Sequence, residues 1–249
     1  MNLIIGRRPV LEAINSGEEI DQVYLLYGQR GEIINAIRIA AKKRGIKCNE
    51  IPAQKFRELV PAGNEPAKQK NTQGVVAKKS SQKFYTLEEV ISHSKKFQYP
   101  LVLVLDSIQD THNLGAILRT AECSEVHGVI ITKHNSAPVN ETVVKTSAGA
   151  TEYLKICPVN NLVNVLKELK DNGFWIIGSS LENSRSYTEV DYKVPAALVL
   201  GNEEKGIRRL TAENCDMLVN VPMKGKIQSL NVSVAAGILL FEILRQRNL

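Results

Sequence analysis

The chain has 249 residues, 43% of them hydrophobic and 23% charged, which is typical of a globular protein with one large or two modest domains. No apolar run approaches the roughly 18 residues that span a bilayer, and the first residues lack the pattern of a secretory signal, so we expect no membrane association. The four cysteines and four histidines show no metal or redox spacing, and we therefore expect no metal and a reducing, cytoplasmic environment.

Positive charge is concentrated in the amino-terminal third of the chain. The net charge of +6 permits attraction to a polyanion. Residues 66–83 contain no acid and five lysines, namely Lys68, Lys70, Lys78, Lys79 and Lys83. We expect this stretch to meet the phosphates of a nucleic acid, although a solvated lysine-rich surface explains the charge equally well.

Helices and strands alternate over the first 80 residues, which indicates a compact α/β module. Apolar residues at helical spacing predict helices over 7–16, 32–44 and 56–60. Apolar and β-branched runs predict strands over 21–27, 46–51 and 72–77. We expect residues 1–79 to form one domain, followed by a polar linker over 80–99 that contains a short helix at 87–97.

From residue 100 the predicted strands are apolar throughout, as in parallel sheets covered on both faces. Such runs predict strands over 101–105, 128–132, 153–157, 174–178, 196–200 and 217–221. Helices are predicted between them, over 113–126, 141–146, 162–170 and 204–215, and a last helix follows residue 231. The repeated β-α-β pattern predicts that residues 100–249 form an α/β domain, a mostly parallel sheet with helices on both faces.

The last predicted helix is apolar on two sides. Asn231 is suited to cap its first turn, because its side-chain oxygen can accept from a backbone N–H. Val234, Ile238 and Phe241 form one stripe, and Leu240 lies on another side. A helix that is apolar on two sides is buried on both, either as an ordinary core helix or against a partner subunit.

Three predicted strands end in segments with unusual residues, and ligands of parallel sheets bind at these carboxyl ends. Segment 106–121 contains Asn113, which can cap the following helix, and Arg119, whose ordinary role would be an ion pair with Glu122. Segment 200–207 places two acids at the expected start of a helix, where a carboxylate complements the helix dipole. Segment 221–231 is the third. None of them has the glycine pattern of a dinucleotide site. In segment 200–207, Gly201 and Gly206 have the spacing of a Walker loop, but Ile207 and Arg208 stand where that loop requires Lys and Ser or Thr.

In this order the three segments resemble the three motifs of the SpoU/TrmH family of RNA ribose 2′-O-methyltransferases. The matching stretches are Asn113-Leu-Gly-Ala-Ile-Leu-Arg-Thr-Ala, Leu200-Gly-Asn-Glu-Glu-Lys-Gly-Ile, and Val221-Pro-Met with Ser229-Leu-Asn-Val-Ser. Near the amino terminus, Ile5-Gly-Arg-Arg-Pro-Val and Gln73-Gly-Val-Val are similar to the RNA-binding domain of the RlmB branch. Three positions depart from the family pattern, namely Thr72, Thr111 and Asn202.

The resemblance implies a trefoil-knotted SPOUT domain that binds S-adenosylmethionine at a homodimer interface, together with a smaller ribosomal-protein-like domain that binds RNA. The residues that would contact the cofactor, carried over by motif, are Leu200, Gly201, Val221 and Leu230. Glycine at a strand end allows close approach, and apolar walls suit an adenine ring.

The resemblance also implies catalytic roles for five residues. Arg119 would be the activating residue, and because arginine stays protonated we expect it to clamp a phosphate and stabilise the developing oxyanion. Asn113, Ser229 and Asn231 would orient the ribose or the carboxylate of the cofactor. Glu203 would hold the motif loops in place.

The RlmB-like amino-terminal segment implies that the partner is RNA rather than DNA, most specifically a guanosine of 23S rRNA. One alternative keeps the chemistry and takes tRNA as the substrate. Another alternative is a non-catalytic RNA-binding or ribosome-assembly protein on the same fold.

Overall fold

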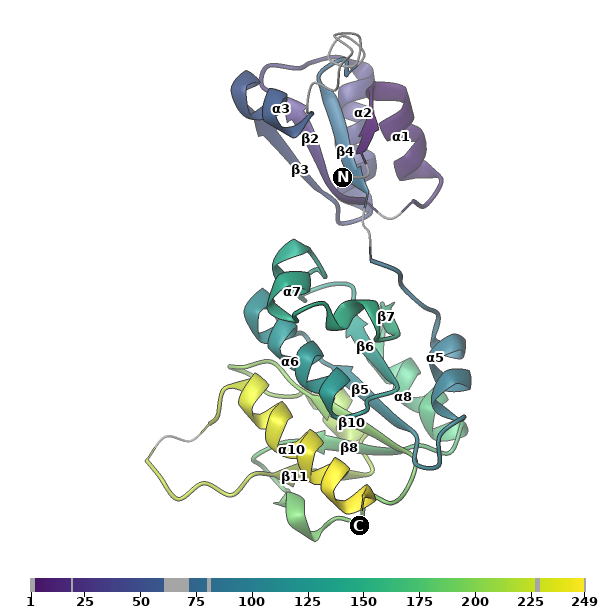
Figure 1. Ribbon diagram of the computed structural model, residues 1–249, viewed down its shortest axis with the longest axis vertical. Coiled ribbons are helices and arrows are strands. Elements are labelled where there is room, and N and C mark those ends of the chain that lie inside the picture. Colours follow the sequence, from purple (N-terminus) through teal and green to yellow (C-terminus); the bar gives the residue numbers. More distant parts are fainter. Residues whose placement is uncertain (1–2, 19, 61–71, 80–81, 227–228, 249) are drawn as a thin grey trace. The chain divides into compact units, whose positions relative to one another are not determined.

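The computed structural model describes residues 3–18, 20–60, 72–79, 82–226 and 229–248. The chain divides into two compact units, Met1–Ser81 and Gln82–Leu249, each with its own sheet (Figure 1). Among the described residues, no helix is long and apolar enough to cross a membrane.

The first unit is a four-stranded sheet with helices on both faces. Its strands lie in the order β1-β4-β2-β3, and β4 runs antiparallel to both of its neighbours. Helices α1 and α2 cover one face, and α3 packs on the other. The elements are β1 (Leu3–Ile5), α1 (Arg7–Asn15), β2 (Ile20–Leu26), α2 (Glu32–Lys43), β3 (Lys47–Ile51), α3 (Ala53–Leu59) and β4 (Val75–Lys79).

The second unit is built on a seven-stranded sheet in which every described pair of strands is parallel. The strand order is β7-β6-β5-β10-β8-β11-β9. All residues of the three strands β5, β6 and β10 are buried, which explains their unbroken apolar sequences. The strands are β5 (Leu101–Leu105), β6 (Gly128–Thr132), β7 (Ile156–Val159), β8 (Trp175–Ser179), β9 (Arg185–Ser186), β10 (Ala196–Leu200) and β11 (Met217–Asn220).

Helices cover both faces of this sheet, which confirms the predicted α/β class. One core joins α6, α7 and α10 to the face that carries Leu103 and Leu105. The other joins α5 and α8 to the face that carries Val102 and Val104. The helices are α5 (Leu87–Ser94), α6 (Thr111–Cys123), α7 (Glu141–Thr146), α8 (Leu162–Asp171), α9 (Arg209–Glu213) and α10 (Val232–Arg247), with short 3-10 turns at Ala150–Glu152 and Tyr187–Glu189.

Several predicted boundaries were wrong for local reasons. Helix α6 begins at Thr111 and is capped by Asp110, whose carboxylate accepts from the N–H groups of His112 and Asn113, so Asn113 is not the cap. The helix expected over 204–215 forms only as α9, since residues 202–206 close a separate turn. The strands expected at 72–77 and 153–157 begin three residues later, the first after a turn with positive φ at Gln73 and Gly74, the second after the 3-10 turn Ala150–Glu152.

Helix α10 has the two apolar sides that its sequence indicates. Asn231 caps it by accepting from the N–H of Ser233 at 2.9 Å. Leu240 lies in the core, whereas Val234 and Phe241 each remain 50% exposed. Helix α10 lies beside α6 (Figure 1) and runs in the same direction, because residue 231 contacts residue 113 and residue 237 lies near residue 120.

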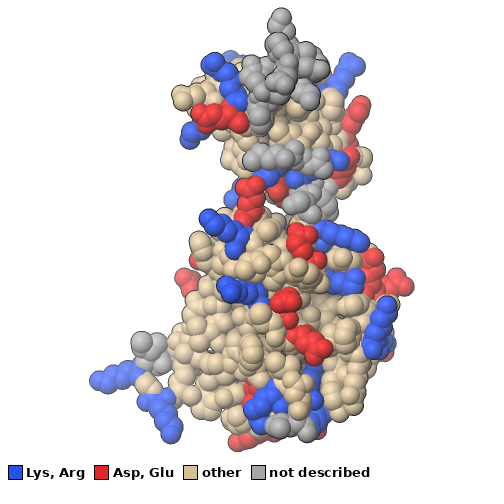
Figure 2. All heavy atoms as spheres, in the orientation of Figure 1, with Lys and Arg blue, Asp and Glu red and all other residues tan. Residues whose placement is uncertain are grey.

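Charged side chains of both signs are intermixed over the face of each unit drawn in Figure 2. The predicted lysine-rich stretch is described only in part, because Lys68 and Lys70 lie outside the described residues. Lys79 pairs with Glu18 at 2.7 Å, and Lys83 lies over the ring of Tyr85. The described residues on this face therefore form no continuous basic stripe, and an RNA site has to be sought in specific clefts.

Candidate functional site

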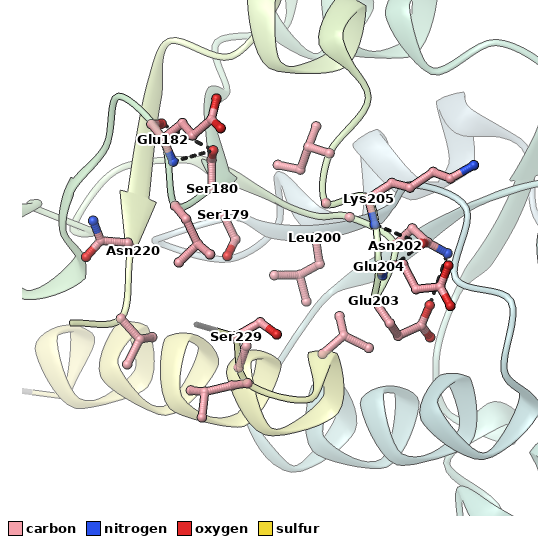
Figure 3. Close-up of a pocket in the computed structure, with 18 of the residues that line it drawn as sticks. Ser179, Ser180, Glu182, Leu200, Asn202, Glu203, Glu204, Lys205, Asn220 and Ser229 are labelled. Carbon is pink, nitrogen blue, oxygen red and sulfur yellow. Dashed lines mark hydrogen bonds between the residues drawn. The ribbon is translucent and has the colours of Figure 1, made fainter. Parts of the chain in front are cut away.

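A pocket of about 420 Å³ opens at the carboxyl ends of β8, β10 and β11 and at the start of α10. In Figure 3, Leu200 lies between the loop that carries Glu182 and the turn that carries Glu203 and Glu204, and Ser229 approaches from the side of α10. The position agrees with the rule that parallel sheets bind ligands where their strands end. The lining residues come from four segments, namely 179–182, 200–207, 220–223 and 229–235.

The turn after β10 is tightly closed. The backbone N–H groups of Asn202 and Gly206 each donate to the carbonyl of the other residue, at 3.0 and 2.9 Å. A Cβ atom at Gly201 would lie 2.1 Å from backbone atoms of Gly206 and Ile207. Gly206 has a φ of +65°, a conformation that favours glycine. Both glycines of the second motif are therefore required by the geometry of the turn.

A polar network joins the three motifs next to this pocket. The side-chain amide of Asn113 donates to Glu203 Oε1 at 3.1 Å, and that of Asn231 donates to Asn113 Oδ1 at 3.0 Å. Asn202 donates to the other oxygen of Glu203 at 3.1 Å. Because both carboxylate oxygens accept a hydrogen bond, Glu203 fixes the orientation of the two amides on either side of it.

A second set of contacts holds the turn to the end of β5. The buried carboxylate of Asp106 accepts from the backbone N–H and the Nε of Arg208. The next residue, Ser107, has a φ of +64°, and its carbonyl accepts from the side chain of Asn202 at 3.0 Å. Hydrogen bonds from residues 202 and 208, one on each side of the turn, therefore hold it to the end of β5.

The structure brings together most of the residues expected at the site. The four expected cofactor contacts, Leu200, Gly201, Val221 and Leu230, line the pocket, and so do Glu203 and Ser229. The remaining polar pair, Asn113 and Asn231, belongs to the network beside the pocket.

Arg119 is placed differently from the other expected site residues. It lies six residues beyond Asn113 on α6, about 9 Å further along the helix axis. Its side chain is exposed, and it is not among the described residues that line the pocket. Within one protomer, the described lining of the cavity therefore does not include the Arg119 guanidinium.

Sequence reasoning missed the contribution of β8 to the pocket. Ser179, Ser180, Leu181 and Glu182, at the end of this strand, form one wall. The predicted strand 174–178 could have indicated this wall, because the residues after a parallel strand lie at the same edge of the sheet as those after its neighbours, where ligands bind. Asn220 and other lining residues near the third motif carry no local signature of their own.

The sequence of the chain matches two family models. Residues 100–241 match the SpoU rRNA methylase family, and residues 3–85 match the substrate-binding domain of RNA 2′-O ribose methyltransferases. A Staphylococcus saprophyticus protein assigned to the TrmH family of tRNA/rRNA methyltransferases is 38% identical over 247 residues, covering 99% of this chain and 96% of its own. The chain belongs to the SpoU/TrmH family of RNA methyltransferases.

Solved structures agree with this family. The AdoMet-bound rRNA methyltransferase of Sinorhizobium meliloti superposes with a TM-score of 0.62 over 98% of this chain and 86% of its own, at 24% identity, and shares the fold. A TrmH/SpoU tRNA-modifying enzyme from A. aeolicus is 34% identical, with a TM-score of 0.56 over 65% of this chain and 82% of its own. The predicted fold class is confirmed, and S-adenosylmethionine is the methyl donor of the SpoU/TrmH family, as predicted.

The pocket of this SpoU/TrmH chain suits that cofactor. Its volume lies within the range of about 300–1,000 Å³ that small-molecule sites occupy. Leu200, Val221 and Leu230 supply apolar surface for an adenine ring. Glu182 and Glu204, also in the lining, offer acceptors for hydroxyl and ammonium groups. Size, apolar walls and polar groups all match a nucleoside that carries an amino acid.

Proposed function

We propose that the chain methylates a ribose 2′-hydroxyl of RNA, and that the target is a guanosine of 23S rRNA. The observation that carries the proposal is that the four expected cofactor contacts, which come from the two segments 200–207 and 221–231, line one pocket. The match of residues 3–85 to a substrate-binding domain of 2′-O ribose methyltransferases supports the ribose hydroxyl as the acceptor.

The cofactor pocket would both bind and shield the donor. When bound, S-adenosylmethionine supplies an electrophilic methyl group on its sulfonium centre. Leu200, Val221 and Leu230 would pack against the nucleoside, while Gly201 lets the backbone approach. Apolar side chains around the reacting atoms exclude water, which strengthens the electrostatic interactions inside the pocket.

Arg119 would supply the positive field at the acceptor oxygen. A ribose hydroxyl is a weak acid, so the site must stabilise the negative charge that develops on its oxygen. A guanidinium stays protonated and is therefore suited to clamp a phosphate and stabilise the oxyanion, while a nearby phosphate of the RNA would accept the proton of the hydroxyl. Ser229, Asn113 and Asn231 would orient the ribose, with Glu203 fixing the two amides through the hydrogen bonds described above.

In a homodimer, Arg119 of one subunit would lie at the cofactor pocket of the other subunit. The half-exposed Val234 and Phe241 form an uncovered apolar stripe on α10, next to the helix that carries Arg119. Packing of this stripe against a second copy would bury it. Since Arg119 is not among the described residues that line its own pocket, we propose that it serves the pocket of the partner subunit.

The two units would have different functions. Residues 1–79 would bind the RNA, 80–99 would join the parts, and 100–249 would carry out methyl transfer in the cytoplasm, where ribosomal RNA is modified. The second candidate substrate is tRNA, because the A. aeolicus enzyme that is 34% identical modifies tRNA.

Replacement of Arg119 by alanine tests the chemistry. We expect Arg119→Ala to lower kcat by about 100-fold or more while the Kd for labelled S-adenosylmethionine stays near the wild-type value. Arg209→Ala is the matched control, because Arg209 is exposed on α9 and pairs with Glu213. An equal loss of cofactor binding in Arg119→Ala would contradict the assigned role.

Mapping of 2′-O-methyl groups in RNA from a deletion strain tests the substrate. Loss of one methylated guanosine in 23S rRNA is expected. Loss of a methyl group in tRNA instead would select the second candidate, and an unchanged methylation pattern would overturn the proposed function.

A further inference from the structure

Three segments of the first unit meet at one edge of its sheet. They are the start of α1 at Arg7, the residues that follow β2 at Gln29, and the turn before β4 at Gln73. The Nε of Arg7 donates to the Gln73 carbonyl at 3.0 Å, and its backbone N–H donates to Gln73 Oε1 at 3.3 Å. A terminal nitrogen of Arg7 also donates to Gln29 Oε1. The three segments are therefore fixed to one another.

The turn before β4 is held in a constrained conformation. Gln73 and Gly74 have φ values of +47° and +72°. A Cβ atom at position 74 would lie 2.7 Å from the side chain of Gln29, so only glycine fits there without displacing that side chain. A non-glycine residue is rarely found at a positive φ unless the surrounding structure holds it there. The surrounding contacts keep Gln73 in this conformation, with its side-chain amide beside Arg7.

These segments line an open cleft, which we call the Arg7–Gln73 cleft. Its lining residues are Arg7, Arg8, Pro9, Gln29, Ile33 and Gln73. Of these described residues, two supply guanidinium groups, two supply carboxamides, two are apolar and none is an acid. Guanidinium groups bind phosphates, and carboxamides offer both a donor and an acceptor to the edge of a base.

An exposed aromatic side chain follows β2 near the cleft in sequence. Tyr27 is 75% exposed and precedes Gln29 by two residues. Its backbone N–H donates to the carbonyl of Ile51, so its backbone position is fixed by the sheet. Unpaired bases of RNA stack on exposed aromatic rings, whereas paired bases are not accessible to them.

We propose that the Arg7–Gln73 cleft binds one unpaired nucleotide of the substrate RNA. Arg8, which is exposed, holds the phosphate, and the amides of Gln29 and Gln73 contact the edge of the base. The inference rests on the proposed function in one respect, since it takes the substrate to be RNA. It adds to that function a defined contact on the first unit.

The test measures binding of the full-length protein to an unmodified 23S rRNA transcript, and in parallel to tRNA, at several salt concentrations. We expect Arg8→Ala to weaken binding several-fold and to lower the slope of log K against log salt by about 0.7–0.9, the value for one lost phosphate contact. We expect Gln29→Ala to weaken binding without changing that slope.

Arg57→Ala is the matched control. Arg57 is exposed on α3, which packs on the opposite face of the sheet from α1 and α2 (Figure 1). Arg57→Ala removes the same charge as Arg8→Ala, and we expect its affinity for RNA to stay close to that of the wild type. Since Arg8 is exposed, its removal is expected to leave the melting temperature unchanged, which thermal unfolding checks.

Wild-type binding by Arg8→Ala, or equal weakening by Arg8→Ala and Arg57→Ala, would overturn the inference. Methyl transfer by the wild-type protein is recorded in the same samples. If the wild type methylates RNA and Arg8→Ala binds normally, the cleft assignment fails and the proposed function stands. If the wild type neither binds nor methylates either RNA, both fail.

Discussion

The backbone N–H and the Nε of Arg208 both donate to the carboxylate of Asp106, at 3.1 and 2.6 Å. Asp106 is fully buried at the end of β5, and Ser107 Oγ donates to the same carboxylate at 3.1 Å. This carboxylate connects the end of β5 to Arg208, two residues beyond the turn that Gly201 and Gly206 allow. Asp106 is not among the described residues that line the pocket, and it acts on the site through the position of that turn.

Replacement of Asp106 by asparagine should therefore affect both stability and cofactor binding. The carboxamide would keep one acceptor oxygen and place an N–H₂ group opposite the donors of Arg208, so we expect a loss of about 1–3 kcal/mol in the free energy of unfolding. We also expect weaker binding of S-adenosylmethionine. Urea unfolding and equilibrium binding measure the two effects. In the Arg208→Met background, Asp106→Asn should lower the free energy of unfolding by less than it does in the wild type. An equal loss in both backgrounds would show that the two side chains do not interact.

The glycines near the pocket differ in how much room they leave. A Cβ atom at Gly201 would meet backbone atoms at 2.1 Å, whereas one at Gly225 would meet nothing within 4 Å. We expect Gly201→Ala to weaken binding of S-adenosylmethionine by about tenfold or more, since overpacking against backbone costs about 1–3 kcal/mol. Gly225→Ala should bind normally. Isothermal titration with both variants checks this, and equal affinities would show that the turn adapts.

The exposed stripe on α10 leads to a prediction about assembly. Phe241 is 50% exposed on α10, and Tyr153 is 80% exposed beside the 3-10 turn after α7. If the α10 stripe packs against a second copy, Phe241→Glu should shift the protein from dimer to monomer and reduce methyl transfer. Tyr153→Glu should leave the dimer intact. Sedimentation equilibrium measures both, and a monomeric wild type would exclude the proposed homodimer.

His127 gives the fold a dependence on pH. Its Nδ1 accepts from the N–H of Leu101 at 2.9 Å, and its ring stacks on Phe97 with the ring centres 3.8 Å apart. Burial, with a further contribution from Arg247, lowers the pKa of His127 from 6.5 to about 4. The unfolded chain thus takes up a proton near pH 6.5, while the folded chain stays neutral until about pH 4.

The contribution of His127 to stability is therefore complete above pH 6.5 and is lost as the pH falls toward 4. We expect the free energy of unfolding to decrease over this window in the wild type. His127→Asn keeps an acceptor near the Nδ1 position and has no titrating group, so its stability should change less with pH. Urea unfolding at pH 7, 6 and 5 provides the comparison, and parallel curves for the two proteins would contradict the prediction.

Two cysteines should resist modification in the folded protein. Burial raises the pKa of the Cys157 thiol to about 11 and that of Cys215 to about 12. Because only the thiolate reacts, we expect both to stay unmodified by a thiol reagent at pH 8 and to react once urea unfolds the chain. Mass spectrometry of the labelled peptides identifies the sites. Cys215 packs against Gly178 of β8, and rapid native labelling of Cys215 would show that this packing opens in the folded protein.

Much of the fold could be predicted from the sequence, because the buried parallel strands have unbroken apolar runs. Strands 101–105, 128–132 and 196–200 have their predicted bounds. The errors arose where polar side chains made local contacts that periodicity does not reveal. Asp110 caps α6 in place of the predicted Asn113. Because residues 202–206 form a turn, α9 begins only at residue 209.

The candidate site was harder to predict than the sheet. The motif resemblance selected residues that line the pocket, but their contacts depend on tertiary structure. Asn113 meets Glu203 across 90 residues of sequence and Asn231 across 118. The wall formed by residues 179–182 lacks a motif, and only its position at the end of a strand could have indicated it.

The hydrogen bond between Asn113 and Asn231 can form only late in synthesis, because the two residues are 118 positions apart in the chain. A ribosome finishes the whole first unit before it reaches β5, and it adds Asn231 only after all seven strands of the second sheet. Domains emerge and fold from the amino terminus, at about 5–20 residues per second. In a nascent chain the first unit, proposed above to bind RNA, is therefore complete several seconds before the pocket proposed to bind the methyl donor.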